Sequence, residues 1–387
     1  IAMNRQTIYS EQMMGSCRVE QACFTAAGGG REVQLMLHAT DSCMTYDEQL
    51  LALLDAYYAL IGGQLQGFQA VFKRFFLSDM ANQKERLLAT LPDNAACATS
   101  VIQQPPMDGT KVALWAYLIE GAVTQMLPCG LSETRHGVYR HLWGGGAVNR
   151  ALHAEYQMRL LFQEYLMQLM EQGGRLADHC IRTWIFVHDV DTNYAGVVKA
   201  RNEVFATQQL TPATHFIAST GINGSAGDAA VKVSFDTYAL LGIVPGQVHH
   251  LYARTHLNPT YEYGVSFERG TYVEYGDRRH VFISGTASIN NKGEVVHPGD
   301  IRRQTERMWE NVEALLAEAE CGFDDVQQMI VYLRDPADYH VVRTLFEARF
   351  NAVPRVFLWA PVCRPGWLIE MECIAVRRVD SKEYPAF

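Results

Sequence analysis

Long apolar runs and an excess of positive charge are both missing from this sequence. No stretch of 18 uninterrupted apolar residues occurs in the 387 residues, so we expect no membrane-spanning helix. The formal net charge is −9, which argues against a broad basic surface for nucleic acid or anionic lipid. An anionic small-molecule substrate would therefore depend on a few local arginines.

Motifs for metals, disulfides and nucleotides are missing as well. The nine cysteines are odd in number and form no CxxC pair, so neither a zinc cluster nor a disulfide framework is indicated. Scattered thiols suit a reducing cytoplasm. The histidines show no metal-ligand spacing, and the glycines at 144–146 lack the GxGxxG and P-loop patterns. We therefore expect no metal and no other cofactor.

A long-period internal repeat is the main organisational signal that the sequence contains. Each of three copies has two strand-like runs, a helix, a strand ending near an aspartate, a second helix and two more strands. The interval from a helix glutamine to that aspartate is 30 residues from Gln49 to Asp79, 32 from Gln157 to Asp189 and 31 from Gln304 to Asp335. The pattern predicts an α/β (α+β) chain of three tandem units, and the alternative is three unrelated α+β modules.

The three predicted units span 1–130, 131–256 and 257–387. In the third, we expect strands at 271–275, 280–289, 329–333, 355–360 and 367–376, with helices at 301–319 and 339–350. In the second, we expect strands at 137–143, 183–187, 213–219 and 231–240, with helices at 156–170 and 194–205. In the first, we expect helices at 47–61 and 84–90, with strands at 70–76, 97–103 and 111–120. Copies of one fold can pack as a pseudo-trimer, so we expect a monomer or a weak oligomer with ligand sites between units.

The third copy resembles the RidA (YjgF, endoribonuclease L-PSP-like) superfamily over about 258–379. The resemblance is carried by 280–288 (His-Val-Phe-Ile-Ser-Gly-Thr-Ala-Ser), Gln304 with 310–312 (Glu-Asn-Val), Pro354-Arg355 and 369–375 (Ile-Glu-Met-Glu-Cys-Ile-Ala). It implies that an arginine at the place of Arg355 holds a substrate carboxylate. It also implies that an acidic residue at the place of Glu370 takes part in hydrolysis.

A narrower resemblance, over about 210–379, is to the chorismatases. It is carried by Asn258-Pro259, 263–265 (Tyr-Gly-Val), 267–269 (Phe-Glu-Arg), 332–336 (Tyr-Leu-Arg-Asp-Pro) and 360–370 (Ala-Pro-Val-Cys-Arg-Pro-Gly-Trp-Leu-Ile-Glu). Those enzymes hydrolyse chorismate, releasing pyruvate and a dihydroxycyclohexadienoate or a hydroxybenzoate. The segment 188–194 (His-Asp-Val-Asp-Thr-Asn-Tyr) departs from this pattern and looks more like a plain RidA-type segment.

The resemblance implies an acid and two carboxylate receptors. Hydrolysis of an enol ether requires protonation of its terminal methylene carbon, and a carboxylic acid kept neutral by burial can supply that proton. Glu370 is the expected acid, and Glu372, on the same face of the strand, is the expected structural partner. Without the resemblance, the sequence alone favours two solvent-facing glutamates on an edge strand. Arg269 and Arg355 are expected to bind the substrate carboxylates through paired hydrogen bonds from their guanidinium groups. The alternative is that each arginine forms an ion pair at the surface.

Four further residues belong to the predicted site or its edge. Tyr263 is expected to stack on the substrate ring or to donate to a carboxylate, unless it is a core aromatic. Cys363 is expected to be a neutral wall residue rather than a nucleophile, because no base is evident beside it. Arg364 either binds substrate or holds its loop. Thr214 falls near the place of Arg355 in the second copy, so we expect one complete site rather than three.

The sequence thus favours a hydrolase of chorismate or of a close enolpyruvyl analogue. The alternatives are an enamine/imine deaminase of RidA type and a non-catalytic small-molecule binder. Glu370, Tyr263 and the segment 363–367 favour the hydrolase.

Overall fold

The computed structural model describes residues 6–92 and 96–387, and it contains one sheet topology three times. The six-stranded sheets run in the orders β1-β2-β3-β6-β4-β5, β7-β8-β9-β12-β10-β11 and β13-β14-β15-β18-β16-β17. In each sheet the last two strands in this order are parallel and the others are antiparallel. The prediction of three tandem units of one α+β fold is therefore confirmed.

Each unit begins with three strands rather than the predicted two, and its later elements follow in the predicted order of types, apart from one short additional helix in the second unit. The first unit contains β1 (Thr7–Met14), β2 (Cys17–Thr25), β3 (Arg31–Ala39), α1 (Tyr46–Gly62), β4 (Phe68–Leu77), α2 (Met80–Thr90), β5 (Ala98–Gln103) and β6 (Val112–Glu120). The second contains β7 (Val123–Met126), β8 (Ser132–His136), β9 (Tyr139–Val148), α3 (Ala154–Glu171), α4 (Leu176–His179), β10 (Cys180–Val187), α5 (Val190–Thr207), β11 (Ala218–Asn223) and β12 (Val233–Leu241). The third contains β13 (Val248–Leu251), β14 (Gly270–Glu274), β15 (Arg278–Ala287), α6 (Ile301–Glu318), β16 (Val326–Leu333), α7 (Tyr339–Arg349), β17 (Arg355–Trp359) and β18 (Ile369–Arg378), with short 3₁₀ turns at Thr260–Tyr263, Phe323–Asp325 and Pro336–Asp338.

One predicted strand is displaced along the chain. The strand expected at 213–219 begins at Ala218 instead, because residues 211–214 form a turn in which the Thr214 hydroxyl donates to the carbonyl of Gln209 at 2.6 Å. The second sheet begins at Val123 and the third at Val248.

The glutamines that revealed the repeat have one structural role in all three units. Each side chain is fully buried, and its oxygen accepts a hydrogen bond from the backbone N–H next to the start of the unit's inner strand: Lys111 for Gln49, Lys232 for Gln157 and Leu368 for Gln304. Each amide nitrogen donates to the loop ahead of its own helix. The repeated interval therefore reflects a repeated helix-to-sheet clamp.

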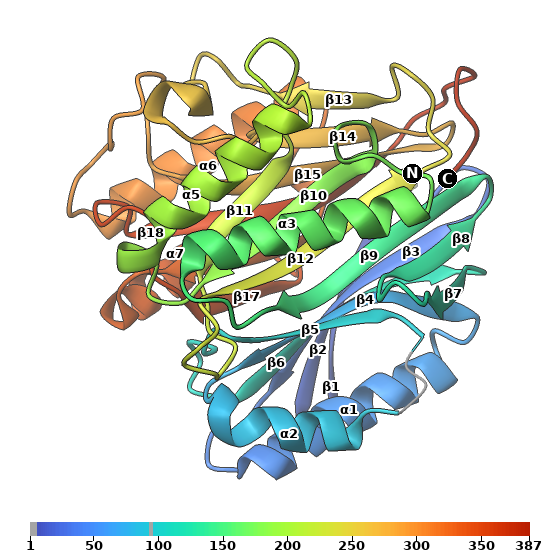
Figure 1. Cartoon of the computed structure of the whole chain (residues 1–387). Helices are drawn as coiled ribbons and strands as arrows, with labels where there is room; N and C mark the ends of the chain where they lie inside the picture. The colour runs from blue at the N-terminus through green and yellow to red at the C-terminus, as the bar shows by residue number, and fades with distance from the viewer. Residues whose placement is uncertain (1–5, 93–95) are drawn as a thin grey trace.

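The helices lie outside and the sheets meet in the middle. In Figure 1 the pairs α1/α2, α3/α5 and α6/α7 each flank a different sheet on the outer side of the molecule. Strand alternation along β6 sends Leu114 and Leu118 to the helix side, whereas Trp115 and Tyr117 join a core shared by the three units. This explains why the inner strands are apolar on both faces.

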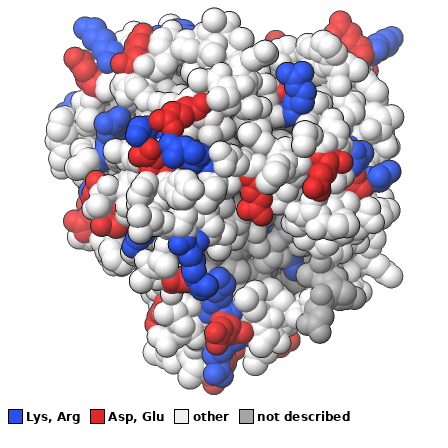
Figure 2. Space-filling view, in the orientation of Figure 1, with Lys and Arg blue, Asp and Glu red and all other residues white. Residues whose placement is uncertain are grey.

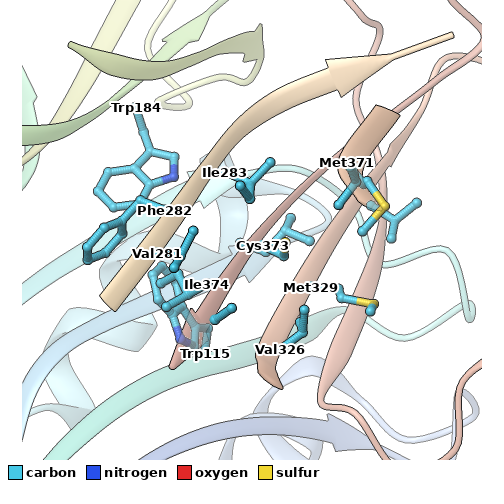
Figure 3. Packing of buried hydrophobic residues seen from close by; sticks show 14 of the residues in the cluster. Trp115, Trp184, Val281, Phe282, Ile283, Val326, Met329, Met371, Cys373 and Ile374 are labelled. Atoms are coloured by element: carbon cyan, nitrogen blue, oxygen red, sulfur yellow. The ribbon is translucent and has the colours of Figure 1, made fainter. Parts of the chain in front are cut away.

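The shared core is rich in aromatic side chains from all three units. Trp115 of the first unit and Trp184 of the second have ring centroids 6.2 Å apart, and Figure 3 shows both beside Phe282 and Ile374 of the third. A buried ion pair joins Arg74 to Asp236, with Nη2 and Oδ2 2.8 Å apart and both side chains inaccessible. Such a core holds the units as one pseudo-trimer.

Surface and hydropathy features of the described residues agree with the composition. None of the helices there is both long and apolar enough to cross a bilayer. On the face shown in Figure 2, basic and acidic side chains are interspersed, without a broad basic patch.

Candidate active site

Glu370 lies at the junction where β11 of the second unit packs against β14 and β15 of the third, hereafter the second–third junction. It sits on β18 opposite Tyr332 of β16, and its side chain is buried, with 3 % of the residue exposed. A register shift in β15 leaves Gly285 over the carboxyl group, and a Cβ placed on Gly285 would lie only 2.0 Å from Glu370 Oε1. The absence of a side chain at Gly285 therefore makes room for this carboxyl.

The carboxyl group of Glu370 has the properties of a proton donor. Burial raises its pKa to about 8, and the negative charge of Glu372 acts in the same direction, against the charges of Arg269 and Arg182. In the described part of the chain, no group donates a hydrogen bond to it within hydrogen-bonding distance. Glu370 is thus predominantly neutral at pH 7 and its proton is free to be donated.

Glu372 is buried too, but it is fully engaged by partners. Its oxygens accept hydrogen bonds from Trp184 Nε1 at 2.6 Å and from the Tyr332 hydroxyl at 3.1 Å, and Arg182 Nη2 lies 3.2 Å away. The reading of two solvent-facing glutamates is therefore wrong, because β18 lies inside the sheet rather than at its edge. Glu372 has the geometry of a structural partner.

Hydrogen bonds lock the two units together beside Glu370. Arg182 Nη2 donates to Thr220 Oγ1 at 2.6 Å, and the same oxygen accepts from the backbone N–H of Gly285 at 3.0 Å. Ser284 Oγ donates to the carbonyl of Glu268 and accepts from the backbone N–H of Ser219. The Ser-Gly-Thr segment therefore positions the junction.

Arg269 and Tyr263 flank the same site from the segment that precedes β14. The Arg269 side chain, 4 % exposed, donates to the carbonyl and to Oδ1 of Asn258, and no described carboxylate pairs with it. The guanidinium carbons of Arg269 and Arg364 each lie 5.6 Å from the centroid of the Tyr263 ring. The Tyr263 hydroxyl is buried and meets no partner at hydrogen-bonding geometry in the described part of the chain, although the Arg269 guanidinium lies near it.

Cys363 forms a neutral part of the wall. Burial raises the pKa of its thiol to about 12, and Tyr194 of α5 lies nearby. A thiol that remains protonated is a poor nucleophile, which agrees with the wall role expected from the sequence.

Arg355 does not join these residues, so the expectation that it converges with Arg269 is wrong. Arg269 immediately precedes β14, whereas Arg355 lies on β17 at the opposite edge of the third sheet. There it faces the first unit, and it lines a cavity of about 250 Å³ with Arg18, His38 and Arg343. The crossover that carries the chain to β17 separates the two arginines.

Thr214 is not the counterpart of Arg355. Arg355 pairs with Met329 of β16, and the matching position on β11 is Ser219, which pairs with Thr183 of β10. Thr214 instead lines a small cavity of about 70 Å³ that reaches the outer side of Arg269 and Asn258.

The same register argument compares the three junctions for an acid. In the third unit, Glu370 pairs with the last but one residue of β16, Tyr332. In the second unit, the last but one residue of β10, Phe186, pairs with Ser234. In the first unit, the last but one residue of β4, Phe76, pairs with Ala113. A carboxyl group occupies only one of these three equivalent positions. The structure therefore agrees with one complete site in the chain.

Sequence reasoning missed the residues that the second unit contributes. Arg182, Tyr194, Arg201 and Thr220 all lie at the second–third junction. Tyr194 was noted only as the end of the departing segment 188–194, and the other three belong to no motif quoted for the resemblance. One signal was available: Arg201 is a lone charge among the buried positions Val197, Ala200 and Val204 of its helix. Among the described residues, no cluster of histidine, cysteine or carboxylate side chains could hold a metal ion.

Comparison with known proteins agrees with this architecture. A solved chorismatase structure superposes with a TM-score of 0.62 and 20 % sequence identity, covering 79 % of this chain and 92 % of that one, which is a likeness of fold. The Endoribonuclease L-PSP family model matches residues 267–377.

Two relatives align with about a quarter of the chain. The 3-aminoacrylate deaminase RutC of Acinetobacter baylyi is 29 % identical over 97 residues, 24 % of this chain and 77 % of that protein. A RutC family protein of Pyrococcus abyssi is 35 % identical over 100 residues, 25 % of this chain and 78 % of that protein. The chain therefore belongs to the RutC family, within the RidA/YjgF superfamily.

Proposed function

We propose that this chain hydrolyses chorismate, or a close enolpyruvyl ether, and releases pyruvate. The observation that carries the proposal is Glu370: a buried carboxyl with a pKa near 8, without a hydrogen-bond donor in the described part of the chain. Of the two arginines that act on it, Arg269 has no carboxylate partner in the described part of the chain, whereas Arg182 is paired with Glu372. An acid of this kind suits the protonation of carbon, which needs a strong donor held away from water.

The proposed reaction needs no group beyond the protein, the substrate and water. Glu370 transfers its proton to the terminal methylene carbon of the enol ether, which becomes a methyl group, and an oxocarbenium ion forms. Water, or a neighbouring substrate hydroxyl, adds to the cationic carbon and loses a proton to the Glu370 carboxylate. After addition of water, the hemiketal passes its hydroxyl proton to the ring oxygen as the bond between the former enol-ether carbon and that oxygen breaks, which gives pyruvate and a dihydroxycyclohexadienoate. After addition of the neighbouring hydroxyl, the bond between that oxygen and its ring carbon breaks and the ring loses a proton, and the remaining hemiketal then breaks down to pyruvate and a hydroxybenzoate. Glu370 ends either cycle protonated.

In this proposal the working site uses the second unit, whose sheet begins at β7 (Val123–Met126), and the third, whose sheet begins at β13 (Val248–Leu251). Arg269 holds a substrate carboxylate, and the Tyr263 ring, flanked by Arg269 and Arg364, offers a face for the substrate ring. Cys363 stays a neutral wall. Thr214 and Arg355 have no part in the reaction.

A second candidate function is imine or enamine deamination, and the relationship to a 3-aminoacrylate deaminase favours it. The two are distinguished by their products. In the first assay, purified protein is incubated with chorismate, and the pyruvate released is measured by coupling to lactate dehydrogenase. In the second, 2-aminoacrylate is generated enzymatically in the presence of the protein, and the ammonia released is measured.

We expect pyruvate release from chorismate that Glu370→Gln abolishes. Acceleration of ammonia release without any pyruvate from chorismate would instead select the deaminase. No effect in either assay, with retained binding of chorismate, would leave the protein a non-catalytic binder and reject hydrolysis.

A further inference from the structure

Residues 379–387 leave β18 of the third unit and cross to the second. The backbone N–H of Gly276, which follows β14, donates to the carbonyl of Pro385 at 2.8 Å. The same carbonyl accepts a hydrogen bond from the hydroxyl of Tyr139, on β9 of the second unit, at 3.0 Å. A Cβ placed on Gly276 would lie 2.5 Å from the carbonyl oxygen of Tyr384, so this close crossing requires a glycine.

The segment ends in a ring that fills a cage made by both units. Phe387 is 5 % exposed, although most of the residues just before it are exposed. Its ring centroid lies 5.0 Å from that of His136 and 5.2 Å from that of His141, both in the second unit. From the third unit, the His280 ring lies 4.6 Å away and the guanidinium carbon of Arg278 4.4 Å away. Phe387 therefore bridges the two units.

The cage also meets the first unit, through a buried carboxylate. Glu32 Oε1 accepts a hydrogen bond from Arg278 Nη1 at 2.8 Å and lies 2.8 Å from His280 Nε2. Its other oxygen accepts from the Tyr117 hydroxyl at 2.7 Å. The side chains of Glu32, Arg278 and His280 are each at most 4 % exposed. Phe387 packs on two of these groups, so it covers the point where all three units meet.

Burial beneath Phe387 keeps two histidines of the second unit uncharged. It lowers the pKa of His136, and it lowers the pKa of His141 to about 3, with the nearby charge of Arg278 acting in the same direction in both cases and that of Glu32 opposing it. The titratable and charged groups around the two rings come from several elements: Glu32, Tyr117, Tyr139, Tyr238, Tyr275, Asp277, Arg278 and His280.

We propose that residues 379–387 form an acid-sensitive strap, which clasps the second and third units together near neutral pH and is released when His136 and His141 take up protons. Release of Phe387 admits water to the two imidazoles, whose pKa then returns to about 6.5. The released form binds protons that the docked form excludes. Docking is therefore fully favoured above about pH 6.5 and weakens as the pH falls below that value.

The strap lies away from the proposed acid. Phe387 contacts the Arg278 end of β15, whereas Gly285, over Glu370, lies near the other end of this strand. The inference therefore stands whether or not the chain hydrolyses chorismate.

Hydrogen exchange measured by mass spectrometry tests the strap at pH 7.5 and pH 5.5, after correction for the intrinsic pH dependence of exchange. In the docked form the Phe387 amide donates to Asp277 Oδ1 at 2.9 Å and the Ser381 amide to the carbonyl of Gly276 at 2.9 Å. We expect the protection of 379–387 to fall at least tenfold between the two pH values, because His141 alone contributes about that factor. Peptides from β10 should keep their protection, which distinguishes release of the strap from global unfolding.

Three variants locate the cause of the response. The double variant His136→Gln/His141→Gln keeps polar side chains that do not titrate, so its strap should be equally protected at both pH values. His215→Gln/His250→Gln is the matched control, because these rings also stack, 4.4 Å apart, but make no ring contact with Phe387; it should respond to pH as the wild type does. Phe387→Ala removes the anchor and should leave the strap unprotected at both pH values.

The opposite results would overturn the proposal. These are equal protection of the wild-type strap at the two pH values, an undiminished fall in the His136→Gln/His141→Gln protein, or loss of protection in β10 together with the strap. Should that double variant not fold, Phe387→Ala decides: with β10 still protected, a strap that keeps the wild-type protection and pH response would show that Phe387 is not its anchor.

Discussion

Arg182 and Glu372 form a buried ion pair across the second–third junction, with Nη2 and Oε2 3.2 Å apart. The pair lies beside Glu370, and the two members act on that acid in opposite directions: Glu372 raises the pKa of Glu370 and Arg182 lowers it. The junction thus couples a structural contact between units with the protonation of the proposed acid.

The pH dependence of turnover should report this coupling. Protonated Glu370 is the active form and its pKa is about 8, so kcat/KM should be maintained below pH 8 and fall as the pH rises through that value. Glu372→Gln removes the like charge and leaves Arg182 uncompensated, and both changes lower the pKa of Glu370. We therefore expect the alkaline fall to begin at a lower pH in this variant, and an unchanged profile would contradict the assignment.

Glu370→Gln should abolish the acid while keeping the shape of the side chain. Loss of general-acid catalysis typically lowers turnover by roughly 10²–10⁴-fold, measurable as pyruvate release under single-turnover conditions. Because the pKa of Glu370 is raised on folding, the folded wild type holds a proton that the unfolded chain releases, and its stability falls as the pH rises from about 4.5 to about 8.

Thermal melts at pH 5 and pH 8 provide the structural control for that variant. The wild type should lose more stability between the two pH values than Glu370→Gln, because the amide does not titrate. Near-normal turnover in a well-folded Glu370→Gln protein would exclude Glu370 as the acid.

Arg269 and Arg355 should differ sharply when each is replaced by lysine. Arg269→Lys removes a guanidinium beside Tyr263 and Glu370, and loss of a charged hydrogen bond of about 1.5–3 kcal/mol should raise KM for chorismate roughly tenfold or more. Arg355→Lys alters the opposite edge of the third sheet and should leave kcat and KM unchanged. Equal damage from the two changes would mean that the sites communicate or that the proposed site is misplaced.

Asp236→Ala should test the ion pair in the shared core. Asp236 accepts two hydrogen bonds from Arg74 and one from the backbone N–H of Gly146, and neither charged side chain is exposed. Removing one partner leaves a buried guanidinium without compensation, which typically costs 3–5 kcal/mol, so the free energy of unfolding should fall by about that amount. Denaturant unfolding measures it, and a change below about 1 kcal/mol would show that water reaches Arg74.

The sequence by itself determined the repeated unit. Buried glutamines at near-constant distances from Asp79, Asp189 and Asp335 mark the same helix-to-sheet clamp in every unit. Local patterns suffice here because each clamp and each apolar helix face acts within one unit. Glu370 could be predicted from the sequence for the same reason, since the motif around it is contiguous and lies on one strand and its preceding loop.

Only the tertiary structure decided which side chains share a site. Arg355 and Glu370 are near in sequence, yet β17 lies at one edge of the third sheet and faces the first unit, whereas Glu370 faces the second. Arg201 is far from Glu370 in sequence and comes to the same junction because α5 packs there. Packing between units sets these proximities, and no period or spacing along the chain encodes which edge of a sheet meets which neighbour.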